Sequence, residues 1–167
     1  MTANPITRTE LFERLRKLGI ATTTIDHPAV FTVAESDALE RDIPGGHTKN
    51  LFLKDAKGRL FLVVAKSTTR VDLKALPKTL GCARLSFGKP ELLLEVLGVS
   101  PGSVTAFALI NDPAGRVSVV IDNALMQHDT VNCHPLENTA TTSISRDDLL
   151  AFMRACGRVP RIEVLDS

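Results

Sequence analysis

The 167-residue sequence contains no tryptophan and no tyrosine, and seven phenylalanines are its only aromatic residues. Proteins that bind single-stranded nucleic acid stack its bases on aromatic side chains, so this shortage argues against such a binding surface. Any nucleic acid would be bound through its phosphates or at its end. No apolar run approaches the ~20 residues of a membrane-spanning helix. No basic stretch followed by an apolar one marks a secretory signal. We therefore expect a cytoplasmic protein without membrane contact and without a DNA partner.

Cysteine is scarce as well. Cys82, Cys133 and Cys156 are odd in number and have no CxxC spacing, which favours free thiols. His128 and His134 do not give the paired spacing of zinc ligands, so we predict no metal. Glycine motifs for dinucleotides or phosphates are also missing, and we predict no cofactor.

Apolar residues make up 44% of the chain, and this length suits one domain with one core, so residues 1–167 should form a single domain. Periodicity and capping signals such as Thr7 with Glu10 predict helices over 8–18, 34–41, 73–80, 91–97 and 145–156. Strands are predicted over 22–26, 50–54, 59–66, 83–87, 104–110, 116–122 and 130–133. Hairpins over 50–66 and 104–122, mixed with short helices, indicate a compact α+β fold with a mixed, mostly antiparallel sheet.

The net charge of +1 conceals an uneven distribution. Residues 1–46 carry 5 positive and 7 negative groups, residues 47–89 carry 10 and 2, and residues 90–167 carry 5 and 10. The middle segment is a candidate surface for a polyanion. The alternative is an ordinary solvated set of lysines that the acidic flanks compensate in space.

Two short motifs suggest hydrolytic chemistry, and neither suits its predicted surroundings. The stretch 98–102 matches the letters of a GxSxG nucleophile elbow, but a helix precedes it and Pro101 removes the amide that would follow the serine. We interpret it as a rigid turn. Cys133 and His134 are neighbours on a predicted strand, where successive side chains point to opposite faces, so a buried structural cysteine is favoured over a dyad.

Polar residues gather at predicted loop–strand junctions, where functional groups are often found. The strings are DHPAVFTVAES (26–36), GGHTKNLFLKDAKGRLFLVV (45–64), LGVSPGSVTAFALIND (97–112) and VNCHPLENTATTSIS (131–145). Together they resemble the YbaK/ProX family of freestanding aminoacyl-tRNA deacylases, relatives of the editing domain in many bacterial prolyl-tRNA synthetases. The resemblance spans nearly the whole chain, looks closest to the ProX-like branch that clears alanine from tRNA(Pro), and implies a compact α+β fold.

The resemblance implies a trans-editing hydrolase that deacylates mischarged tRNA(Pro), Ala-tRNA(Pro) first, by water attack on the aminoacyl ester in a size-excluding pocket. Its partners would be the acceptor end of a mischarged tRNA and prolyl-tRNA synthetase. Such editing is needed because one missing methylene is worth only ~1–3 kcal/mol of discrimination in a synthetase pocket. One alternative is a non-catalytic module of the same fold that binds tRNA or a synthetase. Another is a small-molecule esterase using Ser100.

Matched position by position, the resemblance assigns catalytic roles to Lys49 as a cationic clamp, Asn50 as a hydrogen-bonding group and His134 as an orienting group. Each has a structural alternative: a surface lysine, an asparagine that satisfies backbone groups, and a histidine tied to the backbone. The implied substrate-binding residues are Phe31, Gly46, His47, Gly98, Pro101, Gly102, Asn111 and Cys133.

For some of these positions, a structural role or a different acyl group is an equally good interpretation. The glycines and Pro101 of 98–102 would allow close approach of the aminoacyl group, or would simply end a helix and make a turn. Phe31 and Val33 would wall the pocket or pack in the core. Cys133 is smaller than the apolar residue expected in the alanine-specific branch, so alanine, serine and cysteine all remain candidate acyl groups.

Overall fold

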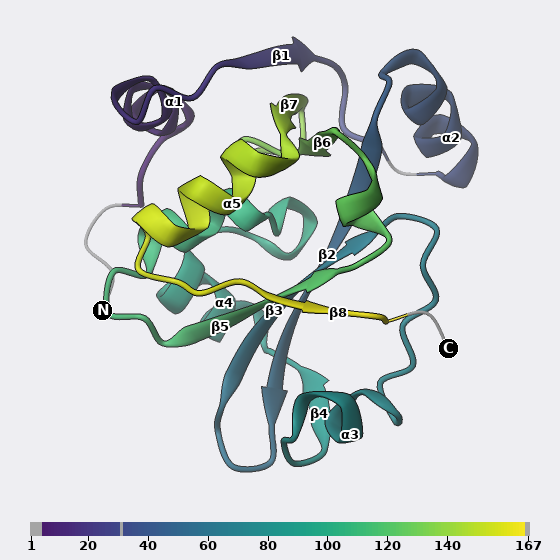
Figure 1. The fold of residues 1–167 in the computed structure, drawn as a ribbon, viewed down its shortest axis with the longest axis vertical. Helices are drawn as coiled ribbons and strands as arrows, with labels where there is room; N and C mark the ends of the chain where they lie inside the picture. Colours follow the sequence, from purple (N-terminus) through teal and green to yellow (C-terminus); the bar gives the residue numbers. More distant parts are fainter. Residues whose placement is uncertain (1–4, 31, 166–167) are drawn as a thin grey trace.

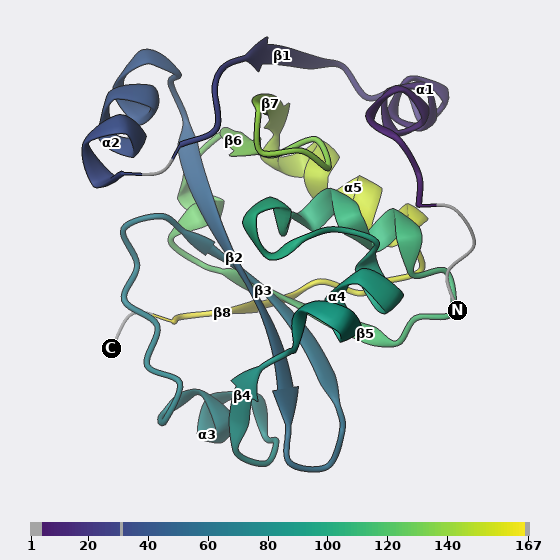
Figure 2. The ribbon, with the colours of Figure 1, turned by 180° about the vertical axis from the view of Figure 1, so that it is seen from behind.

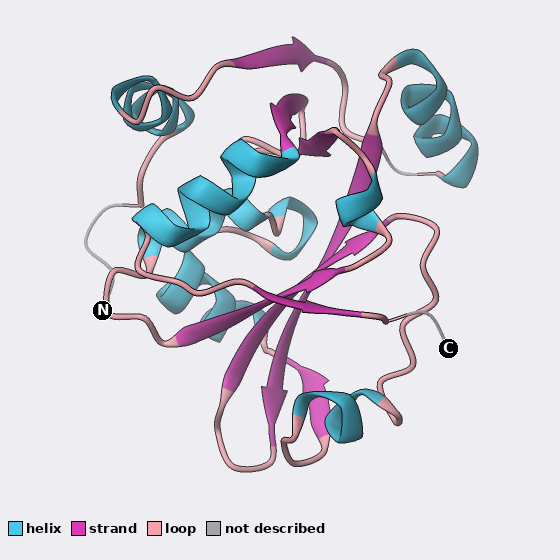
Figure 3. Cartoon of the chain, in the orientation of Figure 1, coloured by secondary structure: helices cyan, strands magenta, loops and turns pink. Residues whose placement is uncertain are grey.

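The strand β2 (Gly46–Asp55) lies at the centre of one mixed sheet and pairs with three other strands. The structure is a computed structural model, and it describes residues 5–30 and 32–165. Phe31, a predicted substrate-binding residue, lies outside this part of the chain, and the side chain of Val33 is not described. The elements of Figure 1 divide into helices around the sheet and strands within it, as Figure 3 shows.

The described helices and strands have the following bounds. The α-helices are α1 (Arg8–Lys17), α2 (Val33–Asp42), α3 (Leu76–Leu80), α4 (Pro90–Leu97) and α5 (Arg146–Ala155), and the 3-10 helices are η1 (Pro101–Ser103), η2 (Ala106–Asn111) and η3 (Leu125–Gln127). The remaining strands are β1 (Thr22–Asp26), β3 (Leu60–Lys66), β4 (Leu85–Phe87), β5 (Val117–Asp122), β6 (Thr130–Cys133), β7 (Ala140–Ser145) and β8 (Arg161–Glu163).

The strand order is β1-β7-β6-β2-β3-β5-β8, and β4 also pairs with β2. Four pairs are antiparallel, namely β1 with β7, β7 with β6, β2 with β3 and β2 with β4. The pairs β2 with β6, β3 with β5 and β5 with β8 are parallel. The predicted α+β fold with a mixed, mostly antiparallel sheet is confirmed.

Local sequence explains where the helices begin and end. Thr7 and Glu10 form the predicted capping box of α1, in which each side chain accepts a hydrogen bond from the other residue's backbone N–H. Ser145 caps α5 by accepting from the amide of Asp148. Gly98 ends α4 in the left-handed conformation at φ 67°, which glycine adopts without steric cost.

Two clusters of buried side chains cover the two faces of the sheet. The larger cluster joins β3 and β5 to α1, α4, η2 and α5, and includes Phe107 and Phe152 in edge-to-face contact at 5.4 Å. The smaller cluster joins the opposite face to α3 and includes Phe61 and Leu76. Figures 1 and 2 show the β2–β3 hairpin, β4 and α3 at one end of the molecule and α1, β1 and α2 at the other.

The predicted hairpin over 104–122 is wrong. Residues Ala106–Asn111 form the 3-10 helix η2, capped by Thr105, and all six residues are buried, so the apolar run reflects complete burial instead of a strand. Asp112 then accepts hydrogen bonds from the amides of Arg116 and Val117 and directs the chain into β5. The strands β7 and β8 were not predicted, and the helix predicted over 73–80 is formed only at Leu76–Leu80.

A buried ion pair ties this turn to the C-terminal segment. Arg158 is 6% exposed, and its guanidinium contacts the Asp112 carboxylate. Its Nε donates to the carbonyl of Val117 at 2.9 Å and Nη2 donates to the Asp112 carbonyl at 2.8 Å. The pair is therefore fully hydrogen-bonded, which is the condition under which a buried ion pair is tolerated.

Replacing Arg158 with methionine should lower the free energy of unfolding by about 3–5 kcal/mol, because the Asp112 carboxylate stays buried without its cation. Arg116→Met is the matched control, since its ion pair with Glu95 is half exposed and should contribute about 0–1 kcal/mol. Urea denaturation of the two variants and the wild type measures the difference. Equal losses in the two variants would contradict the assignment.

Candidate functional site

A small cavity lies between α2 and the first residues of β2. Its volume is about 100 Å³, and α2, β2, β6, β7 and the segment before α2 contribute its walls. The lining residues are Val30, Ser36, Leu39, Glu40, His47, Thr48, Asn132, Cys133, His134 and Thr141. Three predicted site residues, His47, Cys133 and His134, are thereby brought together from two strands far apart in the sequence.

Glycines make the approach of β2 and β6 possible. Gly46 pairs with Val131 in the parallel register, and a Cβ at Gly46 would lie 2.9 Å from the His128 ring. Gly45 has φ 114°, and a Cβ there would lie 2.8 Å from the carbonyl oxygen of Thr130. Gly46 was predicted to bind substrate. The contacts that the structure describes for it are the pairing with β6 and the close approach to His128, which explain the glycine by strand packing.

Backbone carbonyls fix the proton positions on the cavity histidines. A carbonyl oxygen can only accept, so Nδ1 of His134, 3.0 Å from the Ala140 carbonyl, carries the hydrogen and leaves Nε2 as an acceptor. His47 uses its other nitrogen, because its Nε2 donates to the Ile43 carbonyl at 2.7 Å. Each ring therefore keeps one nitrogen that these carbonyls do not use.

Burial controls the chemistry of the two residues at the end of β6. Desolvation lowers the pKa of His134 below its ordinary 6.5, despite an opposing hydrogen bond with Ala140, so the ring is neutral at pH 7. Burial raises the pKa of the Cys133 thiol to about 12, against a smaller lowering by a hydrogen bond with Thr48. Cys133 is thus a protonated wall residue, as the sequence favoured, and a poor nucleophile.

The strand predicted over 50–54 is longer than expected, because β2 begins at Gly46 and ends at Asp55. Lys49 and Asn50 are therefore neighbours within a strand and point to opposite faces. Lys49 pairs with Ala65, a member of the smaller core cluster, and Asn50 pairs with Val64, a member of the larger one. Oδ1 of Asn50 is buried without a hydrogen-bond partner, the only such side-chain atom among the described residues.

The edge of β2 beside these two residues is not covered by a described strand. On that edge β6 pairs only as far as His47 and β4 begins at Leu53. The Phe52 carbonyl accepts from the Gly88 amide on this edge, whereas the His47 carbonyl accepts from Ser67 on the β3 side. Since backbone groups alternate along a strand, those of Asn50 point to the uncovered edge. A ligand lying there would have Lys49 on one side and the Asn50 side chain on the other.

The remaining predicted residues lie in a second group that does not line the cavity. Asn111 is buried, donates to the Leu97 carbonyl at 3.0 Å and accepts from the Ile6 amide at 2.8 Å. Its amide nitrogen would lie 2.9 Å from a Cβ at Gly98. Pro101 and Gly102 are exposed in η1, and Gly102 approaches Asn138 in the connection that follows His134.

Several lining residues were not singled out from the sequence. The helix α2 was predicted, but nothing indicated that Ser36, Leu39 and Glu40 face a cavity. Thr48 was within a quoted string, and its hydroxyl donates to the Asn132 carbonyl at 2.8 Å. The described residues include no group of three or more His, Cys, Asp or Glu suited to a metal ion, and no helix long and apolar enough to cross a membrane.

Comparison with known proteins agrees with this geometry. The family model for the aminoacyl-tRNA editing domain matches residues 27–152. The chain is 42% identical over 161 residues to a zebrafish (Danio rerio) protein named prolyl-tRNA synthetase associated domain-containing protein 1, covering 95% of this chain and 88% of that protein. It is 37% identical over 145 residues to the prolyl-tRNA editing protein ProX of Acetoanaerobium sticklandii, covering 86% and 88%.

A solved structure of a candidate trans-editing enzyme for prolyl-tRNA synthetase superposes with a TM-score of 0.71 at 20% identity, covering 97% of this chain and 98% of that one, which establishes the shared fold. Because the family model matches residues 27–152, the chain belongs to the aminoacyl-tRNA editing domain family. All residues that line the cavity lie inside this matched segment. The identity with ProX confirms the resemblance to the YbaK/ProX family that the sequence strings indicated.

Stability should depend on the titration of His134. Its folded-state pKa lies below 6.5, so the unfolded chain binds the proton first as the pH falls. The contribution of neutral His134 to stability is complete above that value and is lost as the pH drops toward the folded-state pKa. The free energy of unfolding should thus fall as the pH is lowered through 6.5, and His134→Gln should reduce this fall. Identical pH slopes in urea denaturation would contradict the assignment.

Proposed function

We propose that this chain hydrolyses the aminoacyl ester of mischarged tRNA(Pro) in trans, with Ala-tRNA(Pro) as the principal substrate. The observation that carries the proposal is the volume of the cavity in a chain of this family. At about 100 Å³, the cavity is a small space for an acyl side chain. We expect its walls to admit the methyl group of alanine and to exclude the proline ring, which is larger by two methylenes. The size discrimination is part of the proposal, and the comparison of Ala-tRNA(Pro) with Pro-tRNA(Pro) below tests it.

The edge of β2 supplies the groups for the reaction. The terminal adenosine would lie along the uncovered edge, with Lys49 against its phosphate or the ester carbonyl and Asn50 hydrogen-bonded to the ribose or the amine. The buried, unpartnered Oδ1 of Asn50 supports this placement, because a bound donor would satisfy it. Within the 98–102 loop, the Gly98 amide already donates to the carbonyls of Leu93 and Leu94, and Pro101 has no amide hydrogen.

The reaction needs only water as the second reactant. Water, positioned by the ribose 2′-hydroxyl, forms a bond to the carbonyl carbon while the bond from that carbon to the ribose oxygen breaks. A proton returns to that oxygen, and free alanine and tRNA are the products. Lys49 stabilises the negative charge that develops on the carbonyl oxygen. His134 presents its Nε2 lone pair as an acceptor that orients the substrate.

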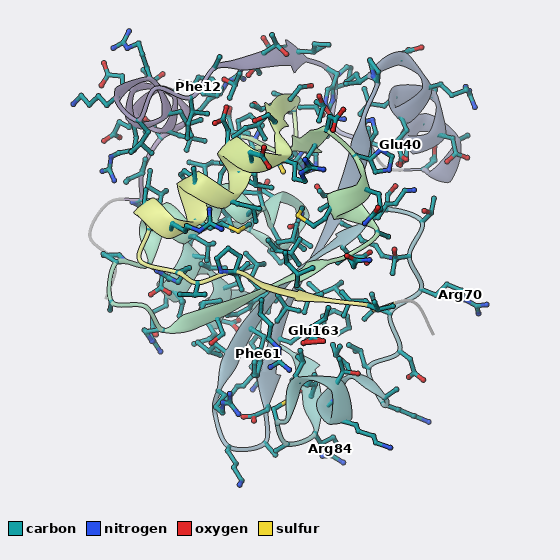
Figure 4. The ribbon with its side chains drawn as sticks, viewed as in Figure 1. Phe12, Glu40, Phe61, Arg70, Arg84 and Glu163 are labelled. Atoms are coloured by element: carbon teal, nitrogen blue, oxygen red, sulfur yellow. The ribbon has the colours of Figure 1, made fainter. Side chains whose placement is uncertain are left out.

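The basic segment 47–89 would hold the acceptor end of the tRNA. Seven of its exposed cations have no described carboxylate within ion-pair distance: Lys54, Lys57, Arg59, Lys74, Lys78, Arg84 and Lys89. They belong to the end of the molecule formed by the hairpin, α3 and β4, where Figure 4 labels Arg84. This arrangement favours the polyanion interpretation over compensation by the acidic flanks.

A non-catalytic tRNA-binding or synthetase-binding module is the second candidate. The same unpaired cations favour it, because they would serve binding without turnover. Prolyl-tRNA synthetase is a proposed partner in either case, and the cytoplasm the proposed place of action.

Purified protein should deacylate Ala-tRNA(Pro) faster than Ser-tRNA and Cys-tRNA(Pro), and far faster than Pro-tRNA(Pro). Lys49→Ala should lower kcat/KM by about 10²-fold, in the range measured for loss of one oxyanion-stabilising group. Lys17→Ala on α1, outside the basic segment, is the matched control, and Ser100→Ala should behave as wild type. A wild type that leaves every charged tRNA intact refutes the enzyme, and Ser100→Ala inactivation would support the esterase alternative instead.

Binding of uncharged tRNA(Pro) should weaken steeply with salt. Each lysine that neutralises a phosphate adds roughly one unit to the slope of log affinity against log salt concentration. The double variant Lys54→Ala/Lys89→Ala should therefore reduce the slope by about two, whereas Lys17→Ala on α1, at the other end of the molecule, should leave it unchanged. Fluorescence anisotropy over a potassium chloride series measures the slope. Equal slopes for all three proteins would exclude this surface.

A further inference from the structure

We propose that Glu40 binds the α-ammonium group of the aminoacyl ester, and that this contact restricts hydrolysis to esters with a free amine. The inference rests on the proposed deacylase function and adds a recognition residue to it. Glu40 lies on the face of α2 that is turned toward β2, as Figure 4 shows, and it lines the cavity together with His134 and Cys133.

The carboxylate of Glu40 is held in place from two elements. Its Oε1 accepts from the Ser67 hydroxyl at 2.9 Å, and its Oε2 accepts from the Ser36 hydroxyl at 3.4 Å. Ser67 follows β3, and its amide donates to the carbonyl of His47, another cavity residue. A carboxylate has about four acceptor positions, so two hydroxyl donors leave capacity for a ligand cation.

The charge of Glu40 is not matched by a cation of the protein. It is the only carboxylate that lines the cavity, and no described lysine or arginine lies within ion-pair distance. The neutral His134 ring on the opposite wall supplies no compensating charge. A partly buried carboxylate in this setting favours a cationic ligand group, since pairing offsets the cost of removing the charge from water.

An aminoacyl ester carries such a group on the carbon next to the carbonyl that water attacks. Because every aminoacyl-tRNA has this ammonium, Glu40 would not choose among side chains, a task left to the cavity walls. It would instead reject esters whose nitrogen has become an amide, as in peptidyl-tRNA, because they would leave the carboxylate unpaired. The alternative is a purely structural role, in which Glu40 only braces α2 against Ser67.

The test uses two substrates that differ in charge and hardly in size: Ala-tRNA(Pro) and the lactyl ester of the same tRNA, in which a hydroxyl replaces the ammonium. Because the two esters differ in intrinsic reactivity, the informative quantity is the ratio of their kcat/KM values compared between proteins. Glu40→Gln should lower kcat/KM for Ala-tRNA(Pro) at least tenfold and leave the lactyl ester within about twofold, so the ratio falls at least about fivefold. Asp37→Asn on the same helix is the charge control, and Ser67→Ala removes the brace while keeping the carboxylate; both should keep the wild-type ratio.

Loss of both activities in parallel in Glu40→Gln, or no change in either, would overturn the role of Glu40 while leaving the deacylase intact. Wild-type inactivity on Ala-tRNA(Pro) would refute the deacylase itself, and Glu40's role with it. A second measurement needs no variant: alaninamide, a cation, should inhibit the wild type, and N-acetylalaninamide should not. Equal inhibition by the two would also overturn the proposal.

Discussion

The pairing of β2 with three strands determines where everything else in this molecule can lie. One edge of β2 is covered by β3 from Thr48 to Lys54, while the other is shared by β6 at its first residues and β4 at its last. The two short partners do not meet, so a stretch of backbone between them keeps an edge without a strand. The cavity opens at the β6 end of this stretch, and its walls come from the elements that β6 and α2 bring to that point.

Charge is separated along the same strand. The cavity contains one carboxylate, Glu40, and neutral polar groups, whereas the exposed lysines begin at Lys54. Thr48 and Lys54 are six steps apart along the strand, which is about 20 Å at the rise of an extended chain. A polyanion with a cationic group at its tip matches this order of charges. On the proposed function, the two ends of one strand would face the two parts of an aminoacylated RNA end.

Much of the architecture could be predicted from local signals. Capping residues and glycine stops located α1, α4 and α5, and short apolar runs beside turn residues located β3 and β5. The strand predicted over 104–110 was wrong because this apolar run is buried on every side and so shows neither helical nor strand periodicity. The site was predictable only as strings of residues, since nothing local indicates that α2 turns Glu40 toward β2. The prediction began the strand at Asn50 and so concealed that Lys49 and Asn50 lie on opposite faces, a relation that follows from the pairing of both residues with β3.

The contact between β2 and β6 joins parts of the chain that are synthesised far apart in time. Asn132 donates to the Pro44 carbonyl across 88 positions, and without that closure the cavity has only half of its walls. Such long-range closure is slow compared with the formation of a local hairpin, because a large loop must be ordered first. The β2–β3 hairpin and its lysines can therefore form early during translation. Affinity for RNA would then arise before the enclosed chamber exists, and a nascent chain could hold nucleic acid before it is able to act on it.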